Sequence, residues 1–437
     1  MGRRQWRDEG GRVAAGWGIL RQIAAGAAAV LMVCAAPGSA SANETADDPR
    51  AYGYDPKAKS VTGSSSMLSG PELAEGAPYR STLTGSGPVY FRVALDARSN
   101  AYVSAVAVPE SDSDLTALHS LQISIVDATG TSCDRQSQGF ANGFAQPLAV
   151  TAIRTIGSAE GETDAKCQQA GTYYVAVSRS SRGAGAAPWK LDLRVDAEAP
   201  LKKAGSGGPS AAAPEAKPTG APSQVDGGSG FGLAAAVPSG TAISDISAGR
   251  SRFYRVPVGW GQRLTVAAEL AASRKGSYVA SAVSVSVYNP ARMHADTAVL
   301  GYRGEAATAD VEDLPAVAYE NRSARQRTDA AMRFPGWYYV KVTASPELAT
   351  TWGQAPLKLS LRLTVDGAAR NQPAYAGDPG IFQIPGVKPS PAPKDPSAAE
   401  DADSGGMKPL AIGAFGTGTL LLAVAGVRVA RAQRTSP

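Results

Sequence analysis

Histidine is nearly absent from this chain of 437 residues, which has only His119 and His294. One precedes an apolar run and the other lies in a segment that reads as a loop, and we expect both to be surface or turn residues. Nucleophilic catalysis by Ser or Cys usually needs a base, most often His. With no nucleophile–base pair, and no Gly-rich loop between a strand and a helix, the sequence predicts a protein that is not an enzyme and binds no cofactor.

The N-terminus has the pattern of a secretory signal peptide. Five arginines within the first 21 residues are followed by an apolar stretch at 23–36 and by Ala40-Ser41-Ala42. Basic, apolar and small-residue regions in this order precede a cleavage site. We expect residues 1–42 to be the signal peptide, with an uncleaved anchor as the alternative, and residues 43–68 to form an N-terminal arm.

The C-terminus predicts a membrane anchor. Residues 409–427 are apolar and uncharged, and a helix of this length spans about 28 Å at ~1.5 Å per residue, close to a bilayer core of roughly 30 Å. Arg428, Arg431 and Arg434 follow with no acidic residue, which assigns residues 428–437 to the cytoplasm. The sequence thus predicts a single-pass protein of the cell membrane with an extracytoplasmic ectodomain, for which the lipid bilayer is one partner.

Between these ends, neither positive nor negative charge is in excess. The chain has 43 basic and 38 acidic residues and a net charge of +5, and residues 1–42 and 428–437 hold eight of the arginines and two of the acidic residues. Residues 43–427 therefore carry 35 basic and 36 acidic residues. The basic isoelectric point reflects targeting and topology, so we expect no nucleic-acid partner.

Cysteine is scarce as well. Cys34 lies in the expected signal peptide, which leaves Cys133 and Cys167 as an even pair in an exported chain, where oxidation is favoured. Two cysteines without histidines are too few for a structural zinc site. The sequence therefore predicts a Cys133–Cys167 disulfide.

The ectodomain repeats itself. The matching segments, in order, are "VYFRVAL" (89–95) with "RFYRVPV" (252–258), "AGTYYVAVS" (170–178) with "PGWYYVKVT" (335–343), and "APWKLDLRVD" (187–196) with "APLKLSLRLTVD" (355–366). The offsets fall between 163 and 168 residues. Similarity at nearly one offset indicates a duplicated domain.

Each repeat is predicted to consist of strands. Apolar and polar residues alternate through the last segment of both copies, and period two with one apolar face is typical of a strand that covers a core on one side. In the second Tyr-Tyr segment Tyr338, Val340 and Val342 should point inward, as Tyr173, Val175 and Val177 should in the first. Lys341 should then lie on the outward face.

The predicted fold class is all-β, with two tandem antiparallel, jelly-roll-like β-sandwiches and a C-terminal transmembrane helix, because long helical periodicity is absent from both copies. The expected sandwiches are residues 69–198 and 233–366. Residues 199–232 read as a flexible linker, and residues 367–408 as a Pro/Ala-rich stalk that ends at the membrane.

Two segments raise the question of a metal site. Asp127, Thr129 and Thr131 in "IVDATGTS" have the spacing of a D-x-[ST]-x-[ST] site, but the matching "VSVSVYNPAR" has Asn289 and no corresponding hydroxyls. Because both segments end in residues that suit a tight turn, we expect a turn. Glu110, Asp112 and Asp114 share one loop and are weak calcium candidates, for which a solvated acidic loop is the simpler interpretation, so no metal site is predicted.

The order of the motifs resembles the bacterial pre-peptidase C-terminal domain. "YFRV", "ISIVDATG", "AGTYYVAV" and "WKLDLRV" occur in the first repeat, and "FYRV", "VSVYNP", "PGWYYVKV" and "LKLSLRL" in the second. The resemblance implies a compact jelly-roll-like β-sandwich, secreted beside peptidases or carried on surface proteins. The heavy use of Ala, Gly and Arg resembles an actinobacterial protein.

The sequence thus predicts a non-enzymatic, membrane-anchored cell-surface protein that presents two β-sandwich binding or structural modules outside the membrane. Its partner would be an envelope protein or a cell-wall polysaccharide. The alternative is an accessory subunit of a membrane-bound envelope complex, of secretion or cell-wall machinery, which contacts its partners through the transmembrane helix. Trp260, Trp337 and Trp352 are expected to pack in the sheets, with a carbohydrate platform as the alternative.

Overall fold

The structure, a computed structural model, describes residues 52–384 apart from 86, 111–114, 116–117, 141–143, 158–165, 181–186, 203–220 and 369–372. Strands dominate these residues, which confirms the all-β fold class. No helix among them is long and apolar enough to cross a membrane. The expected signal peptide, membrane span and cytoplasmic tail lie outside the described residues.

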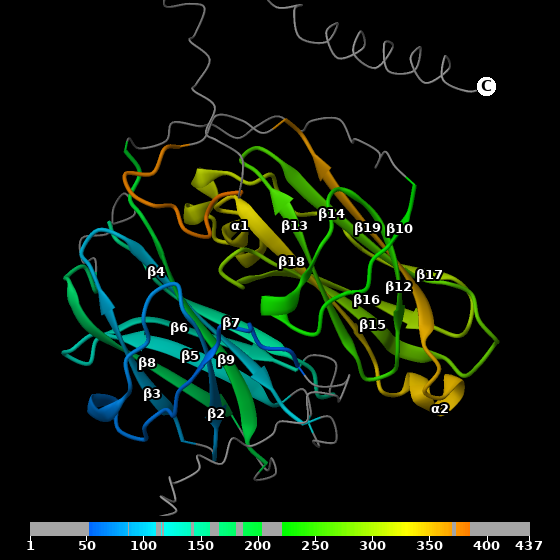
Figure 1. Cartoon of the computed structure of the whole chain (residues 1–437), viewed down its shortest axis with the longest axis horizontal. Helices are drawn as coiled ribbons and strands as arrows, with labels where there is room; N and C mark the ends of the chain where they lie inside the picture. The colour runs from blue at the N-terminus through cyan, green and yellow to red at the C-terminus, as the bar shows by residue number, and fades with distance from the viewer. Residues whose placement is uncertain are drawn as a thin grey trace, which may run out of the picture. The chain divides into compact units, whose positions relative to one another are not determined.

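The first sandwich is built from two sheets (Figure 1). Its strands are β1 (Lys59–Ser60), β2 (Pro78–Leu83), β3 (Val89–Leu95), β4 (Asn100–Val108), β5 (Ser120–Val126), β6 (Ser132–Gly139), β7 (Leu148–Arg154), β8 (Gly171–Ser180) and β9 (Trp189–Glu198). One sheet has the order β1-β2-β9-β4-β7 and the other the order β3-β8-β5-β6. The short β1 pairs with β2 in parallel, and the longer strands pair antiparallel.

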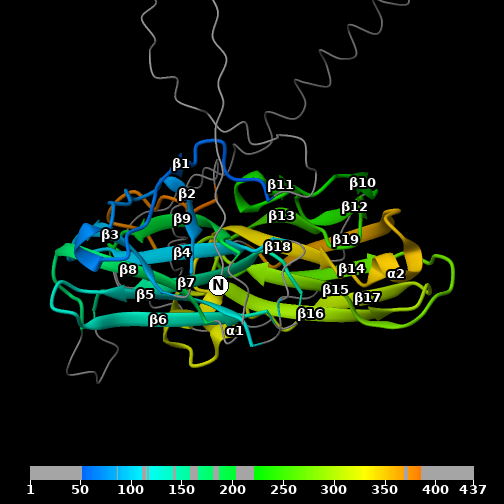
Figure 2. The same cartoon turned by 90° about the horizontal axis from the view of Figure 1, so that it is seen from below.

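The second sandwich also has two sheets. Its strands are β10 (Ser223–Gln224), β11 (Ala235–Ala236), β12 (Gly240–Ile246), β13 (Ser251–Val258), β14 (Arg263–Leu270), β15 (Val279–Tyr288), β16 (His294–Tyr302), β17 (Ala307–Val311), β18 (Gly336–Ala344) and β19 (Leu357–Asp366). The orders β10-β12-β19-β14-β17 and β11-β13-β18-β15-β16 repeat those of the first sandwich, with β11 added. Figure 2 shows both sandwiches with their sheets in layers.

Short helices connect the strands. They are η1 (Met67–Ser69), η2 (Phe231–Leu233), η3 (Tyr319–Ser323), α1 (Arg327–Ala331) and α2 (Leu348–Trp352). The segment from η3 through α1 lies between β17 and β18, at the place of the β7–β8 loop in the first sandwich. The two copies therefore differ in how this connection is built.

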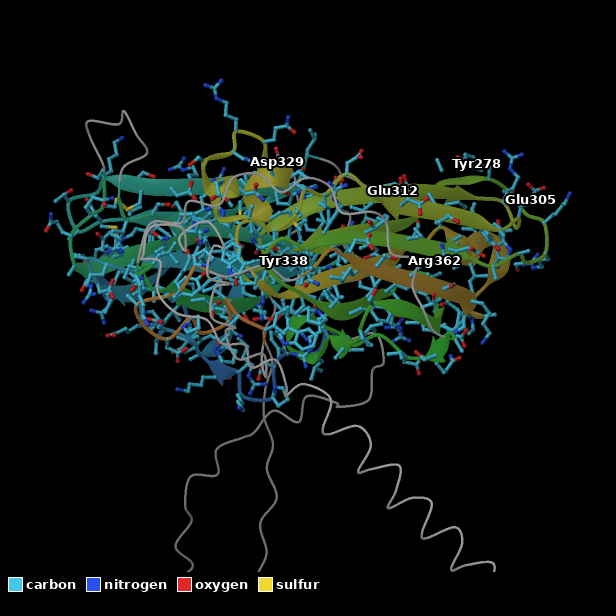
Figure 3. The ribbon with its side chains drawn as sticks, turned by 90° about the horizontal axis from the view of Figure 1, so that it is seen from above. Tyr278, Glu305, Glu312, Asp329, Tyr338 and Arg362 are labelled. Carbon is cyan, nitrogen blue, oxygen red and sulfur yellow. A yellow bond between two sulfur atoms is a disulfide. The ribbon has the colours of Figure 1, made fainter. Side chains whose placement is uncertain are left out.

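Alternating residues of the Tyr-Tyr strands fill the cores. Tyr338, Val340 and Val342 are buried in the core of the second sandwich, and Figure 3 labels Tyr338 within it. The equivalent residues Tyr173 and Val175 are buried in the first core. Since each sheet turns one apolar face to its partner sheet, the period-two prediction is confirmed for these strands.

Segments expected to lack structure pack against the sandwiches. Within the expected linker, β10 pairs with β12 and η2 buries Phe231. In the expected stalk Phe382 is fully buried, 5.2 Å from Tyr102 between ring centroids. The expectation of a coil was wrong for the described parts of the linker and the stalk, because isolated aromatic residues in these polar stretches pack against apolar surface of the sandwiches.

Candidate functional site

The turn between β5 and β6 is built by Asp127. Its Oδ1 accepts hydrogen bonds from the backbone N–H of Thr129 (2.9 Å) and of Thr131 (2.8 Å), and from the Thr129 hydroxyl (2.7 Å). The bond from the Thr129 hydroxyl is the largest of the causes that lower the pKa of Asp127. Gly130 completes the turn with a φ of +88°. The turn prediction is confirmed.

The matching turn between β15 and β16 has the same hydrogen bonds. Asn289 Oδ1 accepts from the backbone N–H of Ala291 and of Met293, both at 3.0 Å. Arg292 stands where the first turn has Gly130, and it also has a positive φ, +59°. Glycine adopts this conformation freely, whereas a residue with a Cβ loses about 1–2 kcal/mol. The interactions of the Arg292 side chain must therefore offset a strained backbone.

Arg292 joins the second sandwich to the first. Its Nη1 lies 2.9 Å from Oδ1 of Asp192 on β9, and the two side chains are 3% and 0% exposed. The Tyr52 hydroxyl donates to Oδ2 of Asp192 at 2.7 Å. Burial is the largest single influence on the pKa of Arg292 and lowers it, but Asp192, Tyr52 and Tyr339 together outweigh burial and raise that pKa. Burial, and after it the charge of Asp192, raises the pKa of Tyr52, so Arg292 and Tyr52 both keep their protons at neutral pH.

Lys341 is a second charge buried between the sandwiches. It lies on the outward face of β18, as predicted, but the first sandwich covers that face and the residue is 1% exposed. Its Nζ donates to Gln146 Oε1 (2.9 Å) and to the carbonyl of Pro147 (2.7 Å). Burial lowers the pKa of Lys341 to about 7, because neither acceptor is a carboxylate that would stabilise the charged form.

Glu198, at the end of β9, collects contacts from three segments. It accepts hydrogen bonds from the hydroxyls of Tyr102 and Tyr375, both at 2.9 Å, and from Nη2 of Arg322 in η3. Aromatic residues fill the rest of the junction, where Phe231 packs edge-on against Tyr288 with centroids 5.2 Å apart. Two buried carboxylates on β9, those of Asp192 and Glu198, thus form ion pairs with arginines of the second sandwich.

A cleft of about 640 Å³ lies at this junction. The first sandwich contributes residues of β6, β7 and the ends of the β7–β8 loop, and the second contributes Met293, His294 and residues 322–333. The β7–β8 and β17–β18 connections are equivalent in the two copies. The same loop of each repeat therefore lines one shared cleft.

The described lining of the cleft is basic. Among its described lining residues one carboxylate, that of Asp134, accompanies six cationic side chains. The cations are Arg154, Lys166, Arg322, Arg325, Arg327 and Arg333. Asp134 already accepts hydrogen bonds from Ile153 N–H and Gln136 Nε2, both at 2.8 Å. The charge of the lining therefore favours an anion.

Two arginines of the cleft, Arg154 and Arg322, retain unused donors. Arg154 donates to the backbone carbonyls of Asp96, Ser99 and Gln169, and Arg322 donates to Glu198 and to the carbonyl of Arg333. Within the described residues, Nε of Arg154 and Nε of Arg322 are buried and have no acceptor. A buried donor without an acceptor costs about 1–3 kcal/mol, so both positions can gain from a ligand or a water.

The predicted disulfide is confirmed and forms part of the cleft. Cys133, on β6, is bonded to Cys167, just before β8, and both line the cleft. Cys167 has a φ of +60°, and its carbonyl accepts from the Tyr173 hydroxyl at 3.0 Å. The bond holds the described end of the β7–β8 loop against β6, where Lys166 and Gln168 face the cleft.

Of the three calcium candidates, only Glu110 lies within the described residues. Glu110 is exposed, and Asp112 and Asp114 lie outside the described residues. Within the part of the chain that is described, no group of three or more His, Cys, Asp or Glu could hold a metal ion. The carbohydrate-platform alternative also finds no support, since Trp260 and Trp352 are buried and Trp337 packs under Arg255.

The expectation of a surface or turn residue was wrong for His119, whereas His294 is partly exposed and closely follows the β15–β16 turn. His119 directly precedes β5 and is 4% exposed. His294 begins β16, lines the cleft and bonds to the Thr297 hydroxyl at 2.8 Å. Burial, and after it the charge of Lys341, lowers the pKa of His294 to about 4, so the imidazole is neutral at pH 7 and adds no charge to the cleft.

The basic cleft itself was missed by sequence reasoning. Four of its cations come from "RSARQRTDAAMR" (322–333). The density of arginine there was a usable signal, but near-neutral charge over the whole ectodomain concealed it. Arg154 and Lys166 lie far away in the sequence and gave no signal.

Comparison with known proteins finds solved structures that resemble the chain in fold, but it assigns the chain to no family. Neither a family model nor a curated protein sequence matches the chain. Among solved structures, the CBM22-1–CBM22-2 tandem domain from Paenibacillus barcinonensis Xyn10C is 11% identical, with 66% of this chain and 86% of that chain covered and a TM-score of 0.19. The triple jelly roll protein of an archaeal virus is 8% identical, with 65% and 58% covered and a TM-score of 0.17. At these TM-scores the likeness carries no functional argument.

Proposed function

We propose that the chain is a non-enzymatic cell-surface protein, anchored in the membrane by residues 409–427, that presents two joined β-sandwiches as one binding body outside the membrane. The observation that carries the proposal is the shared basic cleft. Both repeats contribute equivalent loops to it, and buried contacts such as Asp192–Arg292 join its two sides. A site of this kind requires the two modules to act together.

The disulfide and the patterns at the two ends of the sequence support a location outside the cell membrane. A disulfide persists in oxidising surroundings, and Cys133–Cys167 is such a bond. The N-terminal signal pattern and the apolar segment followed by arginines have the order of a secreted, anchored chain. The resemblance to pre-peptidase C-terminal domains agrees with display on a surface and supplies no activity.

The topology is tested with protease on intact, wall-stripped cells. Both sandwiches should be lost while the short C-terminal tail is protected. Recovery of an intact chain of full mass, under conditions in which a known surface protein is digested, would contradict the proposed orientation.

The accessory-subunit alternative is tested by replacing residues 409–427 with an unrelated membrane helix. Under the proposed function, the variant still binds its partner in cells when it is present on the surface in the same amount as the parent, because the joined sandwiches form the binding site. Loss of activity at equal surface level would assign the specific contacts to the native helix, in which Ala414 and Gly418 have the spacing of a close helix–helix contact.

A further inference from the structure

We propose that the cleft binds the phosphate groups of a phosphodiester-linked polymer, which crosses the junction and contacts both sandwiches at once. The assignment rests on the proposed function in one respect, namely that the polymer is a component of the cell envelope. The binding chemistry itself follows from the lining of the cleft.

The first step is charge. Arg325 and Arg327 are exposed in the η3–α1 segment, and no carboxylate among the described residues forms an ion pair with either. Lys166 extends the same charge to the opposite wall. Like charges gathered without counter-ions destabilise a folded protein. A ligand that carries repeated negative charges removes this repulsion on both walls.

The second step is the kind of cation. Five of the six cations are arginines, whose planar guanidinium presents several N–H donors in a fork that matches phosphate or carboxylate oxygens, whereas lysine acts as a point charge. A carboxylate accepts hydrogen bonds close to its own plane. A phosphate is tetrahedral and accepts from several directions. Donors that come from two walls and several elements therefore suit a phosphate better.

The third step is the unused donors. The buried Nε–H groups of Arg154 and Arg322 have no acceptor among the described residues, and both residues line the cleft. Their other donors are held by protein carbonyls and by Glu198, so the guanidinium planes are fixed. Fixed, desolvated donors lose little entropy when an anion binds.

The fourth step is size and the neutral lining. A volume of about 640 Å³ lies within the range of roughly 300–1,000 Å³ that is typical of ligand sites. Ser137 and Gln138 of β6, and Gln168 next to Cys167, line the cleft with neutral hydrogen-bonding groups. Such groups suit the hydroxyls of a sugar or polyol between successive phosphates. Cations and neutral groups together favour an alternating polymer over a free phosphate ion.

The test measures binding of poly(glycerol phosphate) to the full-length protein. The Arg325→Gln + Arg327→Gln variant should bind at least about tenfold more weakly than the parent, since two charge-assisted contacts with phosphate are lost. The Arg263→Gln + Arg362→Gln variant is the matched control, since it removes the same charge from exposed positions on β14 and β19. Figure 3 labels Arg362 on β19 and Asp329 on α1, at different places on the second sandwich.

Equal weakening by the two double variants would overturn the site, because the effect would then be one of net charge alone. A third variant, Arg325→Lys + Arg327→Lys, keeps the charge and removes the fork. It should lose part of the affinity, and full affinity would overturn the guanidinium argument. Denaturant unfolding of each variant shows whether the fold is retained.

Other anions distinguish the ligand class. Poly-L-glutamate of matched charge should bind more weakly than poly(glycerol phosphate), and equal or tighter binding would assign the cleft to acidic peptides. Vesicles of phosphatidylglycerol should compete poorly with the soluble polymer, and the reverse would assign the cleft to lipid headgroups. Absence of binding to all three probes would overturn this inference and leave the protease and helix-replacement tests of the proposed function unaffected.

Discussion

The β5–β6 and β15–β16 turns are built alike and lie in different surroundings. Asp127 and Asn289 cap the two turns through the same backbone donors. The first turn is exposed and has Gly130 at its left-handed position, whereas the second has Arg292 there. The strained residue is the one that bonds to Asp192 of the other sandwich. One turn therefore has a structural role alone, and the other also forms part of the contact between the sandwiches.

The β7–β8 and β17–β18 connections differ in a parallel way. The first is tied to β6 by the Cys133–Cys167 bond, and the second is ordered by η3 and α1. Asn321 fixes this second connection through its side-chain donors to the carbonyls of Ala316 and Met332. A disulfide thus holds one wall of the cleft, and hydrogen bonds hold the equivalent wall in the other sandwich.

The largest expected effect is on the second turn. Arg292→Ala keeps a Cβ at the strained position and leaves Asp192 buried without its cation, which should lower the free energy of unfolding by about 3–5 kcal/mol. Arg292→Gly should lose about 1 kcal/mol less, because glycine relieves the backbone strain. Denaturant unfolding of the full-length chain measures both. A loss under ~1 kcal/mol for the alanine variant would mean that the pair contributes nothing to the fold.

Removal of the disulfide should have a slightly smaller effect. Cys133→Ser + Cys167→Ser opens a loop with a sequence separation of 34, and the chain-entropy relation gives a loss of about 3–4 kcal/mol. The variant should also bind poly(glycerol phosphate) more weakly, since Lys166 is no longer held at the cleft. Unchanged thermal stability after reduction would show that the loop is held without the bond.

Lys341 gives a dependence on pH. Its pKa is lowered from 10.5 to about 7 in the folded chain, so between these values the unfolded chain binds more protons and the free energy of unfolding rises with pH. Lys341→Met should remove the part of this rise seen between pH 7 and 9, and should stabilise the chain most at pH 7 and below. Urea titrations at pH 6, 7, 8 and 9 measure the slope. Parent and variant curves that run parallel would contradict the assignment.

Asp127→Asn should have the smallest effect. It gives the first turn the residue that the second turn already uses at Asn289, and substitutions at such exposed sites usually change stability by no more than about 0.5 kcal/mol. Melting temperature should not depend on calcium or magnesium in parent or variant. A cation-dependent rise in the parent that is lost in the variant would restore the metal-site interpretation.

The alternation of apolar and polar residues, together with the residue types in the turns, predicted much of the fold. The inward face of β18 and the turn at Asp127 follow from alternation and from side chains that bond to nearby backbone. Alternation says which face a residue lies on and not what packs over that face, so Lys341 was placed on the correct face while its burial was missed. For the same reason Asp192 reads as a solvated residue in "WKLDLRVD" although it is fully buried.

The candidate site was predictable only in part. The disulfide followed from cysteine count and compartment, and it proved to be a wall of the cleft. The cleft depends on the packing of residues that are distant in the sequence, such as Arg154 and Arg327, and no local pattern relates them. Phe382 was assigned to a stalk because a single aromatic residue in a Pro-rich tract has no periodic neighbours.

The central claim is that the two sandwiches are joined through buried charge, and a double-mutant cycle on Asp192 and Arg292 tests it most directly. The variants Asp192→Asn, Arg292→Met and their combination would be unfolded in denaturant at constant salt and pH. A coupling of about 2 kcal/mol or more is expected, because residues in direct contact couple by about 0.5–3 kcal/mol and this pair is almost fully desolvated. A coupling within about 0.5 kcal/mol of zero, the value for distant independent sites, would contradict the claim. The two sandwiches would then be independent domains joined by a flexible linker.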